Sequence, residues 1–322
     1  MKESAVSLPP GSKVLVTGSA GFIGSNLVEA LLEQGVEVTG LDNFSGGLRE
    51  NVEEFAGNSL YHFIEGDICD MDTCLRASDG ADYILHQAAL GSVPRSMREP
   101  LLYVKNNVEG TSNIFDAARQ NGVKRVVYAS SSSVYGDSQE LPKREDKTGN
   151  PLSPYALSKA VNEQYAALYG RLYGLSCIGL RYFNVFGPRQ NPDSPYAALI
   201  PLIFKHLESG QAMKIFGDGE QSRDFTYIGN VIQANIRACL AGEDAGGSAY
   251  NIAYGERYTV NEVYAIIADA VGSSQKPEYA QPRAGDILHS LADTSRAREM
   301  LGYLPRWDFK AGIAEALAWY LA

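Results

Sequence analysis

The sequence predicts an α/β protein with a doubly wound parallel β-sheet and a smaller mixed C-terminal portion. Three observations predict it. Over the first half, short apolar runs of strand length alternate with amphipathic runs of helix length. A glycine-rich turn follows the first apolar run directly, and after about Asn184 the alternation gives way to a proline-rich stretch at 187–196. Buried strands that alternate with helices form parallel sheets covered on both faces.

The individual elements follow from these periodicities. Six strands are expected at 13–17, 36–41, 61–65, 83–87, 125–130 and 175–181. The segments 22–34, 101–120 and 154–173 have helical spacing, and 200–208 and 311–320 are expected to form two later helices. A hairpin is expected around Gly217 and Gly219, and residues 250–253 are expected to return to the main sheet as a further strand.

Composition and charge exclude several classes of protein. With 322 residues and a formal net charge of -10, a nucleic-acid partner is not expected, because phosphate backbones are bound by clustered cations. Neither a signal peptide nor a membrane span is indicated, so we expect a cytoplasmic protein. The four cysteines and four histidines have no metal-ligand spacing, so no metal site is expected.

The glycine turn predicts a dinucleotide site. Gly18, Gly21 and Gly24 lie between the first strand and the first helix, where glycines allow a tight turn and a close approach of the backbone to a pyrophosphate. The helix N-terminus offers free N–H groups to the phosphates. Asp42 follows 18 residues later, at the end of the second strand, and can accept hydrogen bonds from ribose hydroxyls. Its charge would repel a 2′-phosphate, so NAD is favoured over NADP. Asp67, at the end of the third strand, is a weaker candidate.

A run of serines and a tyrosine–lysine pair supply candidate chemistry. Four serines, residues 130–133, end the fifth strand at the edge where such sheets bind ligands. Ser153 and Pro154 suit the start of a helix. Tyr155 and Lys159 are then one turn apart on one face. A nearby ammonium favours a phenolate, so the pair predicts a tyrosine acting as a base.

These motifs, taken together, resemble the extended short-chain dehydrogenase/reductase family with its Rossmann-type sheet, and within it the UDP-glucose/UDP-N-acetylglucosamine 4-epimerases. The resemblance covers nearly the whole chain. It rests on TGSAGFIG (17–24), HQAALGSVPR (86–95), NNVEGT (106–111), SSSSVYG (130–136), YALSK (155–159), RYFNVFG (181–187), GDGEQSRDF (217–225) and HSLAD (289–293).

The resemblance implies a mechanism. Tyr155 would be the general base for the sugar 4-hydroxyl, Lys159 would hold the nicotinamide ribose and tune Tyr155, and Ser131 would relay the proton. Hydride would leave sugar C4 for a tightly bound NAD, and the 4-keto sugar would turn over before hydride returns to its other face. Related dehydratases and decarboxylases carry acids near the serine run. Here Ser132 and Ser133 occupy those places, which argues against both reactions.

The resemblance also implies binding residues. For NAD these are Gly18, Gly21, Phe22, Ile23, Gly24, Asp42, Asn43, Phe44, Ser45, Asp67, Ile68, Gln87, Ala88, Ala89, Asn107, Tyr155, Lys159 and Phe183. For the UDP-sugar they are Ser92, Ser131, Ser132, Ser133, Asn184, Ala198, Leu199, Arg223, Arg283, Asp286 and Ser290. Ser290 would lie beside the sugar C2 substituent, where enzymes restricted to glucose and galactose tend to carry tyrosine. A serine leaves room for an N-acetyl group.

The resemblance leaves the substrate and the partner chain as expectations. UDP-N-acetylglucosamine and UDP-N-acetylgalactosamine are the expected substrates, with UDP-glucose and UDP-galactose as further ones. A UDP-glucuronate 4-epimerase and a non-catalytic NAD-binding regulator are the alternatives. Residues 1–186, with a returning segment near 226–255, are expected to bind NAD, and 187–322 mostly the UDP-sugar. Relatives form homodimers through the helices at about 101–120 and 154–173, so a homodimer is expected.

Overall fold

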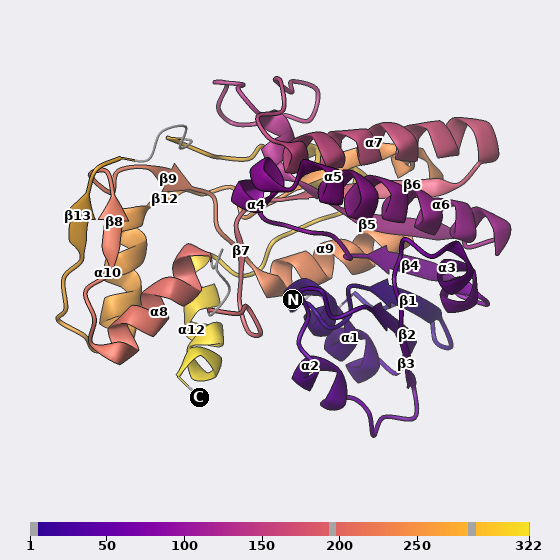
Figure 1. The fold of residues 1–322 in the computed structure, drawn as a ribbon, viewed down its shortest axis with the longest axis horizontal. Helices are drawn as coiled ribbons and strands as arrows, with labels where there is room; N and C mark the ends of the chain where they lie inside the picture. Colours follow the sequence, from indigo (N-terminus) through magenta and orange to yellow (C-terminus); the bar gives the residue numbers. More distant parts are fainter. Residues whose placement is uncertain (1–5, 193–197, 283–287, 322) are drawn as a thin grey trace.

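The computed structural model describes residues 6–192, 198–282 and 288–321, and its centre is a seven-stranded parallel sheet (Figure 1). The order of the strands is β11-β6-β5-β4-β1-β2-β3, and every neighbouring pair is parallel. The strands are β1 (Lys13–Thr17), β2 (Glu37–Asp42), β3 (Tyr61–Glu65), β4 (Tyr83–His86), β5 (Arg125–Ser131), β6 (Ser176–Tyr182) and β11 (Ser248–Ile252). This order confirms the predicted Rossmann-type sheet and the returning strand.

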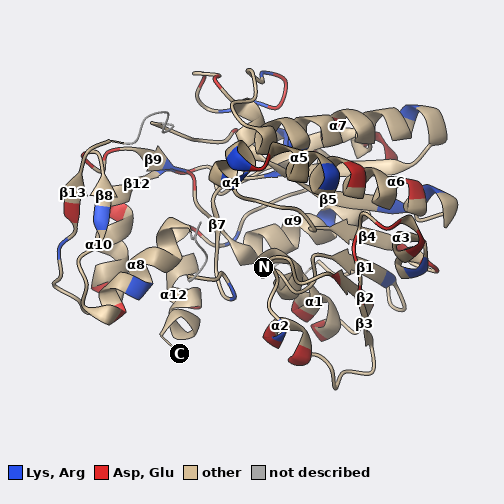
Figure 2. Cartoon of the chain, viewed as in Figure 1, with Lys and Arg blue, Asp and Glu red and all other residues tan. Residues whose placement is uncertain are grey.

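Helices cover both faces of the sheet and bury its central strands, while the edge strand β3 stays partly exposed. On one face lie α1 (Phe22–Glu33), α9 (Ile228–Leu240) and α11 (Ser295–Leu301), which contribute to one apolar core. On the other lie α3 (Met71–Ser78), α6 (Gly110–Gln120) and the long α7 (Pro154–Tyr173), which share a second core. The short α2 (Glu50–Glu53) precedes β3. Figure 2 shows acidic and basic residues mixed along α6.

The helix expected over 101–120 is interrupted. Two short helices, α4 (Val93–Arg98) and α5 (Pro100–Tyr103), lead into a π-helix at Val104–Glu109 before α6 begins. Within the π-helix, Asn107 is fully buried, and its side chain accepts from the Leu90 N–H and donates to the Leu90 carbonyl. The wide turn therefore places a buried amide against the loop that follows β4, a tertiary interaction that helical spacing does not encode.

Many of the elements after β6, though not α9, β11 and α11, gather at one end of the molecule (Figure 1) around a third apolar core. They include β7 (Val185–Phe186), which pairs with β10 (Thr226–Tyr227), and the helices α8 (Leu199–Ser209), α10 (Val260–Ala270) and α12 (Phe309–Tyr320). The predicted hairpin is wrong. Gly217 and Gly219 do turn the chain with positive φ, but β8 (Lys214–Phe216) pairs in parallel with β13 (Glu278–Ala280), while β9 (Ser222–Arg223) pairs with β12 (Tyr258–Thr259). Among the described residues, no helix is long and apolar enough to cross a membrane.

Candidate active site

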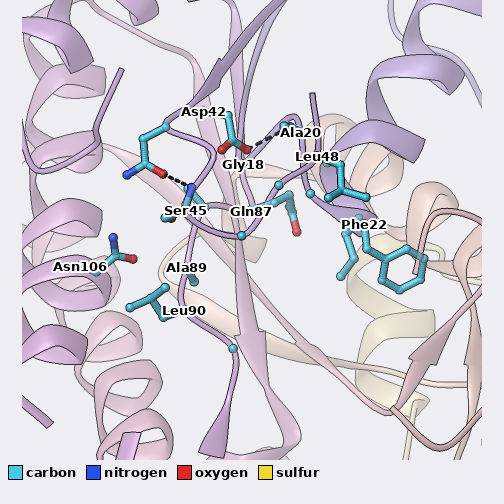
Figure 3. Close-up of a pocket in the computed structure, with 18 of the residues that line it drawn as sticks. Gly18, Ala20, Phe22, Asp42, Ser45, Leu48, Gln87, Ala89, Leu90 and Asn106 are labelled. Carbon is cyan, nitrogen blue, oxygen red and sulfur yellow. Dashed lines mark hydrogen bonds between the residues drawn. The ribbon is translucent and has the colours of Figure 1, made fainter. Parts of the chain in front are cut away.

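A cavity of about 880 Å³ opens at the carboxyl ends of β1, β2 and β4 (Figure 3). Its lining includes most of the predicted cofactor residues: Gly18, Gly21, Phe22, Ile23, Gly24, Asp42, Asn43, Ser45, Ile68, Gln87, Ala88 and Ala89. Ser92 and Ala198, both predicted to contact substrate, line it as well. The carboxyl edge of a parallel sheet is where such folds bind their ligands, so the position suits a nucleotide.

The glycine turn forms a cradle that side chains would fill. Gly18 has φ +69°, and a Cβ there would lie 2.7 Å from the Ala88 nitrogen. A Cβ on Gly24 would lie 2.0 Å from the Gly18 carbonyl oxygen. Gly21 precedes α1 and carries no side chain that could cap it. The first N–H groups of α1 are therefore available to an anion such as a pyrophosphate.

Asp42 stands beside this turn, at the end of β2. Its carboxylate accepts from the N–H groups of Ala20 at 3.0 Å and Phe44 at 2.8 Å, and Figure 3 shows the contact with Ala20. Burial raises the pKa of Asp42, and the backbone hydrogen bonds counteract part of that effect. A carboxylate fixed at the rim of the cavity suits a ribose diol and opposes a 2′-phosphate. The cradle and Asp42 together fit NAD.

Four predicted cofactor residues lie behind the lining. Asp67 accepts from the side-chain amide of Asn43 at 3.0 Å. Phe44 packs on Phe63 with ring centroids 5.4 Å apart, and Asn107 holds Leu90 as described above. Phe183 is fully buried and packs against Tyr135. Their roles in cofactor binding stay predictions. In the structure, Asp67 and Asn107 hold the lining residues Asn43 and Leu90.

The predicted base lies at the first turn of α7. The Ser153 hydroxyl caps that helix by accepting from the Ala156 N–H at 3.1 Å, which sets the first turn. The Tyr155 ring packs edge-on against Tyr103, a residue that lines the cavity, with ring centroids 6.3 Å apart. Burial raises the pKa of Tyr155, and a hydrogen bond with Ser131 acts in the opposite direction. The contact with Ser131 brings together two of the three predicted catalytic residues.

Lys159 lies one turn further along α7, almost fully buried. Its ammonium donates to the Ala129 carbonyl on β5 at 2.7 Å. Burial lowers the pKa of Lys159 to about 8, while the charge of Glu163 acts to raise it. Burial also lowers the pKa of His86 to about 3, so this neighbour of Lys159 is neutral over the working range. The protonation state of Lys159 therefore depends on the few charged groups near it.

A second cavity of about 580 Å³ adjoins the first. Asn184, Ala198, Leu199 and Arg223, all predicted to contact substrate, line it. Ala198 and Gln190 line both cavities, so the two are neighbours. Phe186, Phe216 and Phe225 add apolar walls. An apolar cavity with the Arg223 guanidinium in its lining suits a nucleoside diphosphate.

The remaining predicted substrate residues are not among the lining of either cavity, or they fall outside the described residues: Ser131, Ser132, Ser133 and Ser290 belong to the first group. Ser131 caps the 3₁₀-helix at Ser132–Tyr135 by accepting from the Ser133 N–H. The Ser133 hydroxyl is buried and makes no hydrogen bond within the described chain. Ser290 is buried, and its N–H donates to the Ser222 carbonyl at 3.0 Å. Arg283 and Asp286 lie outside the described residues.

Several lining residues were missed by the sequence analysis. They are Asn51, Arg95, Glu99, Tyr103, Asn106, Arg189, Gln190 and Asn191. Figure 3 shows Asn106 across the cavity from Gly18. Its neighbour Asn107 was predicted instead, and only the π-helix geometry decides which of the two faces the cavity. Asn51 donates to the Ala20 carbonyl at 2.8 Å from a helix that has no signal in the sequence.

Comparisons with known proteins agree with this geometry. Residues 14–253 match the model of the NAD dependent epimerase/dehydratase family. The chain is 40% identical to the UDP-glucose 4-epimerase of Mycolicibacterium smegmatis, over 96% of this chain and 98% of that protein. A UDP-N-acetylglucosamine 4-epimerase from Methanobrevibacter ruminantium, solved with UDP-N-acetylmuramic acid, is 39% identical, with a TM-score of 0.92 over 97% of this chain and 99% of that one.

A third similar protein carries the cofactor. The UDP-glucuronic acid 4-epimerase of Bacillus cereus, solved with UDP-glucuronic acid and NAD, is 32% identical, with a TM-score of 0.87 over 96% of this chain and 99% of that one. Both the predicted family and NAD as its cofactor are confirmed. The chain belongs to the NAD dependent epimerase/dehydratase family.

Proposed function

We propose that the protein is a UDP-sugar 4-epimerase that interconverts UDP-N-acetylglucosamine and UDP-N-acetylgalactosamine, with UDP-glucose and UDP-galactose as secondary substrates. Curated and solved relatives that cover nearly the whole chain support the reaction class. The observation that carries the sugar preference is Ser290, a small side chain beside the strand that bears Arg223. A serine leaves a volume that a tyrosine would occupy, and an acetamide needs that volume.

The gating role of Ser290 can be tested directly. Ser290→Tyr should abolish turnover of the acetylated pair and spare that of UDP-glucose and UDP-galactose. Ser209→Tyr, at the exposed end of α8 and outside the lining of both cavities, is the matched control. A Ser290→Tyr enzyme that still turns over the acetylated sugars defeats the gating explanation.

The chemical roles follow from the positions on α7 and β5. When bound, NAD supplies the hydride-accepting and hydride-returning chemistry. Tyr155 would remove the proton from the sugar 4-hydroxyl, and Ser131, in hydrogen-bond contact with Tyr155, would pass it on. Lys159 would stabilise the phenolate and hold the nicotinamide ribose. Tyr155→Phe should abolish epimerisation and keep NAD bound, because it removes one oxygen and leaves the glycine cradle intact. Unchanged turnover would remove Tyr155 from this role.

Glucuronate is the second substrate that a relative suggests. We favour a neutral hexosamine because the RYFN stretch ending at Asn184 and the segment at Ala198 and Leu199 resemble the hexose and hexosamine enzymes. The proposal also divides the chain into two binding regions. Residues 1–186, with the segment near 226–255, would bind NAD, and 187–322 would mostly bind the UDP-sugar.

A homodimer is part of the proposal. An exposed apolar stripe runs along α4, α5 and the π-helix through Met97, Leu101 and Val104, and Leu101 is 81% exposed. A second stripe runs along α7 through Leu157 and Leu172. The helical segment from α4 through the π-helix and the long α7, each with an exposed apolar stripe, can pack against the same pair from a second copy as a four-helix bundle.

A further inference from the structure

A buried polar network surrounds Glu163, one turn beyond Lys159 on α7. Tyr155, Lys159 and Glu163 follow each other at intervals of four residues, so all three share one helix face. The Glu163 side chain is 17% exposed, although the face of α7 toward the sheet is otherwise mostly apolar or amide-bearing. A carboxylate is costly to place there unless its partners are fixed.

Glu163 has three such hydrogen bonds. The Ser130 hydroxyl donates to its Oε1 at 2.5 Å. Arg181 on β6 donates from Nε to Oε1 at 2.9 Å and from Nη2 to Oε2 at 2.8 Å, the two-pronged geometry in which a guanidinium holds a carboxylate most firmly. Both carboxylate oxygens are thus occupied, and the rotamer of Glu163 is fixed.

Arg181 is itself held from the far side. Its Nη1 donates to the Tyr135 hydroxyl at 3.0 Å and to the Glu145 carbonyl at 3.2 Å. The Tyr135 hydroxyl donates to Asn251 Oδ1 on β11 at 2.6 Å. The Asn251 amide donates to the carbonyls of Lys143 and Asp293. The network therefore connects α7 to three strands of the sheet and to the segment that carries Ser290.

We propose that Glu163 is a positioning residue for the Tyr155–Lys159 pair: held by Ser130 and Arg181, it keeps a fixed negative charge one turn from Lys159 and so keeps Lys159 protonated beside the phenolate. The inference deepens the proposed function, since it assigns no new reaction and rests on Tyr155 acting as the base. A surface ion pair would not serve this purpose, because solvent would screen it.

The charges around Lys159 are few enough for one carboxylate to matter. On α7 itself, Tyr155 and Glu163 lie one turn to either side of Lys159. From β4 the neutral His86 faces Lys159, and from β5 the Ala129 carbonyl accepts its hydrogen bond. The guanidinium of Arg181, on β6, is paired with Glu163. Burial opposes the charge of Lys159, and Glu163 is the group that favours it. Removing that charge makes Lys159 lose its proton at lower pH, so the ammonium that would stabilise the phenolate of Tyr155 is lost earlier as the pH rises.

The test is the pH profile of Glu163→Gln, in which the amide keeps the shape and hydrogen-bonding oxygen but lacks the charge. Activity requires protonated Lys159, so the basic limb of the kcat profile should move to lower pH, and a displacement of one pH unit corresponds to about tenfold in rate on that limb. The acidic limb, which reports the deprotonation of Tyr155, should not move to higher pH, because the substitution removes a negative charge. KM should change little. Glu163→Asp, which restores the charge at shorter reach, should return the basic limb toward its wild-type position. Glu33→Gln, on the exposed end of α1, is the control.

If Glu163 only stabilised the fold, Glu163→Gln would change activity in a different way. If Glu163→Gln lowers kcat equally at every pH, in proportion to lost NAD or a lower Tm, the inference is overturned. An NMR titration of Lys159 in the NAD-bound protein, with its signal assigned by comparison with Lys159→Arg, needs no turnover. If no UDP-sugar is epimerised, this titration still decides: a lower apparent pKa of Lys159 in Glu163→Gln supports the inference, and an unchanged one refutes it.

Discussion

Gly24→Ala tests the dinucleotide cradle at its tightest point. The added Cβ would lie 2.0 Å from the Gly18 carbonyl oxygen, 2.7 Å from the Gly18 carbonyl carbon and 2.9 Å from the Ser19 Cα. All three atoms belong to the backbone of the turn, so no side-chain rotation relieves the contact. Because contacts below 3.0 Å are essentially never seen for Cβ atoms, turn and helix must separate by at least about 1 Å.

Two opposing effects determine how much Gly24→Ala changes the stability of the protein. Alanine in place of a helical glycine stabilises α1 by about 1 kcal/mol. Overpacking against a fixed backbone costs about 1–3 kcal/mol, and the separation also weakens the Gly21 N–H to Gly18 carbonyl hydrogen bond, 3.0 Å long. The net loss of stability is small, but the N–H groups of α1 move away from the position in which they meet the pyrophosphate. A loss of about 2 kcal/mol in NAD binding corresponds to about thirtyfold in affinity.

The assay is the NAD content of the purified protein, followed by epimerase activity with and without added NAD. We expect Gly24→Ala to purify with little NAD and to recover activity when NAD is in excess. Gly57→Ala is the matched control, since a Cβ at Gly57 meets nothing within 4 Å. Wild-type NAD content in Gly24→Ala would refute the account of the turn as a backbone cradle.

Three further predictions follow from other parts of the molecule. Asp42→Ala orphans the N–H groups of Ala20 and Phe44, and calorimetry should show NAD binding weakened by about 1–3 kcal/mol. Burial raises the pKa of Asp224 to about 7. Between about pH 4 and pH 7 its carboxyl group is therefore protonated in the folded state and deprotonated in the unfolded state. Asp224 therefore makes stability fall as pH rises through that window, and Tm measured against pH should lose this component in Asp224→Asn. Leu157→Glu with Leu172→Glu places charges in the exposed stripe of α7, and light scattering should report a monomer where the wild type is a dimer; a dimeric variant would contradict the proposed interface.

The sequence was most informative where the local backbone conformation or helix capping requires a particular residue type. The glycines of the first turn, Asp42 and the Ser153–Tyr155 helix start are specified by conformation or capping, and these features hold in the structure. The parallel sheet was predictable because its strands are continuous apolar runs bounded by turns.

The remaining features depend on tertiary contacts. The hairpin at Gly217 failed because the turn residues do not determine which strand pairs with β8, and β13, some sixty residues later, is its partner. Asn106 rather than Asn107 lines the cavity because a π-helix rotates the chain between α5 and α6. Glu163 and Arg181 carry no local signal at all, since their pairing joins a helix to a strand that follows it.

The most direct test of the proposed function is the substrate panel without added cofactor. Purified protein is incubated separately with UDP-N-acetylglucosamine, UDP-glucose and UDP-glucuronate, and the product epimers are identified by NMR. The account predicts that UDP-N-acetylgalactosamine forms fastest, with the bound NAD regenerated in each turnover. Turnover of UDP-glucuronate alone, or equal or faster turnover of UDP-glucose, would contradict it.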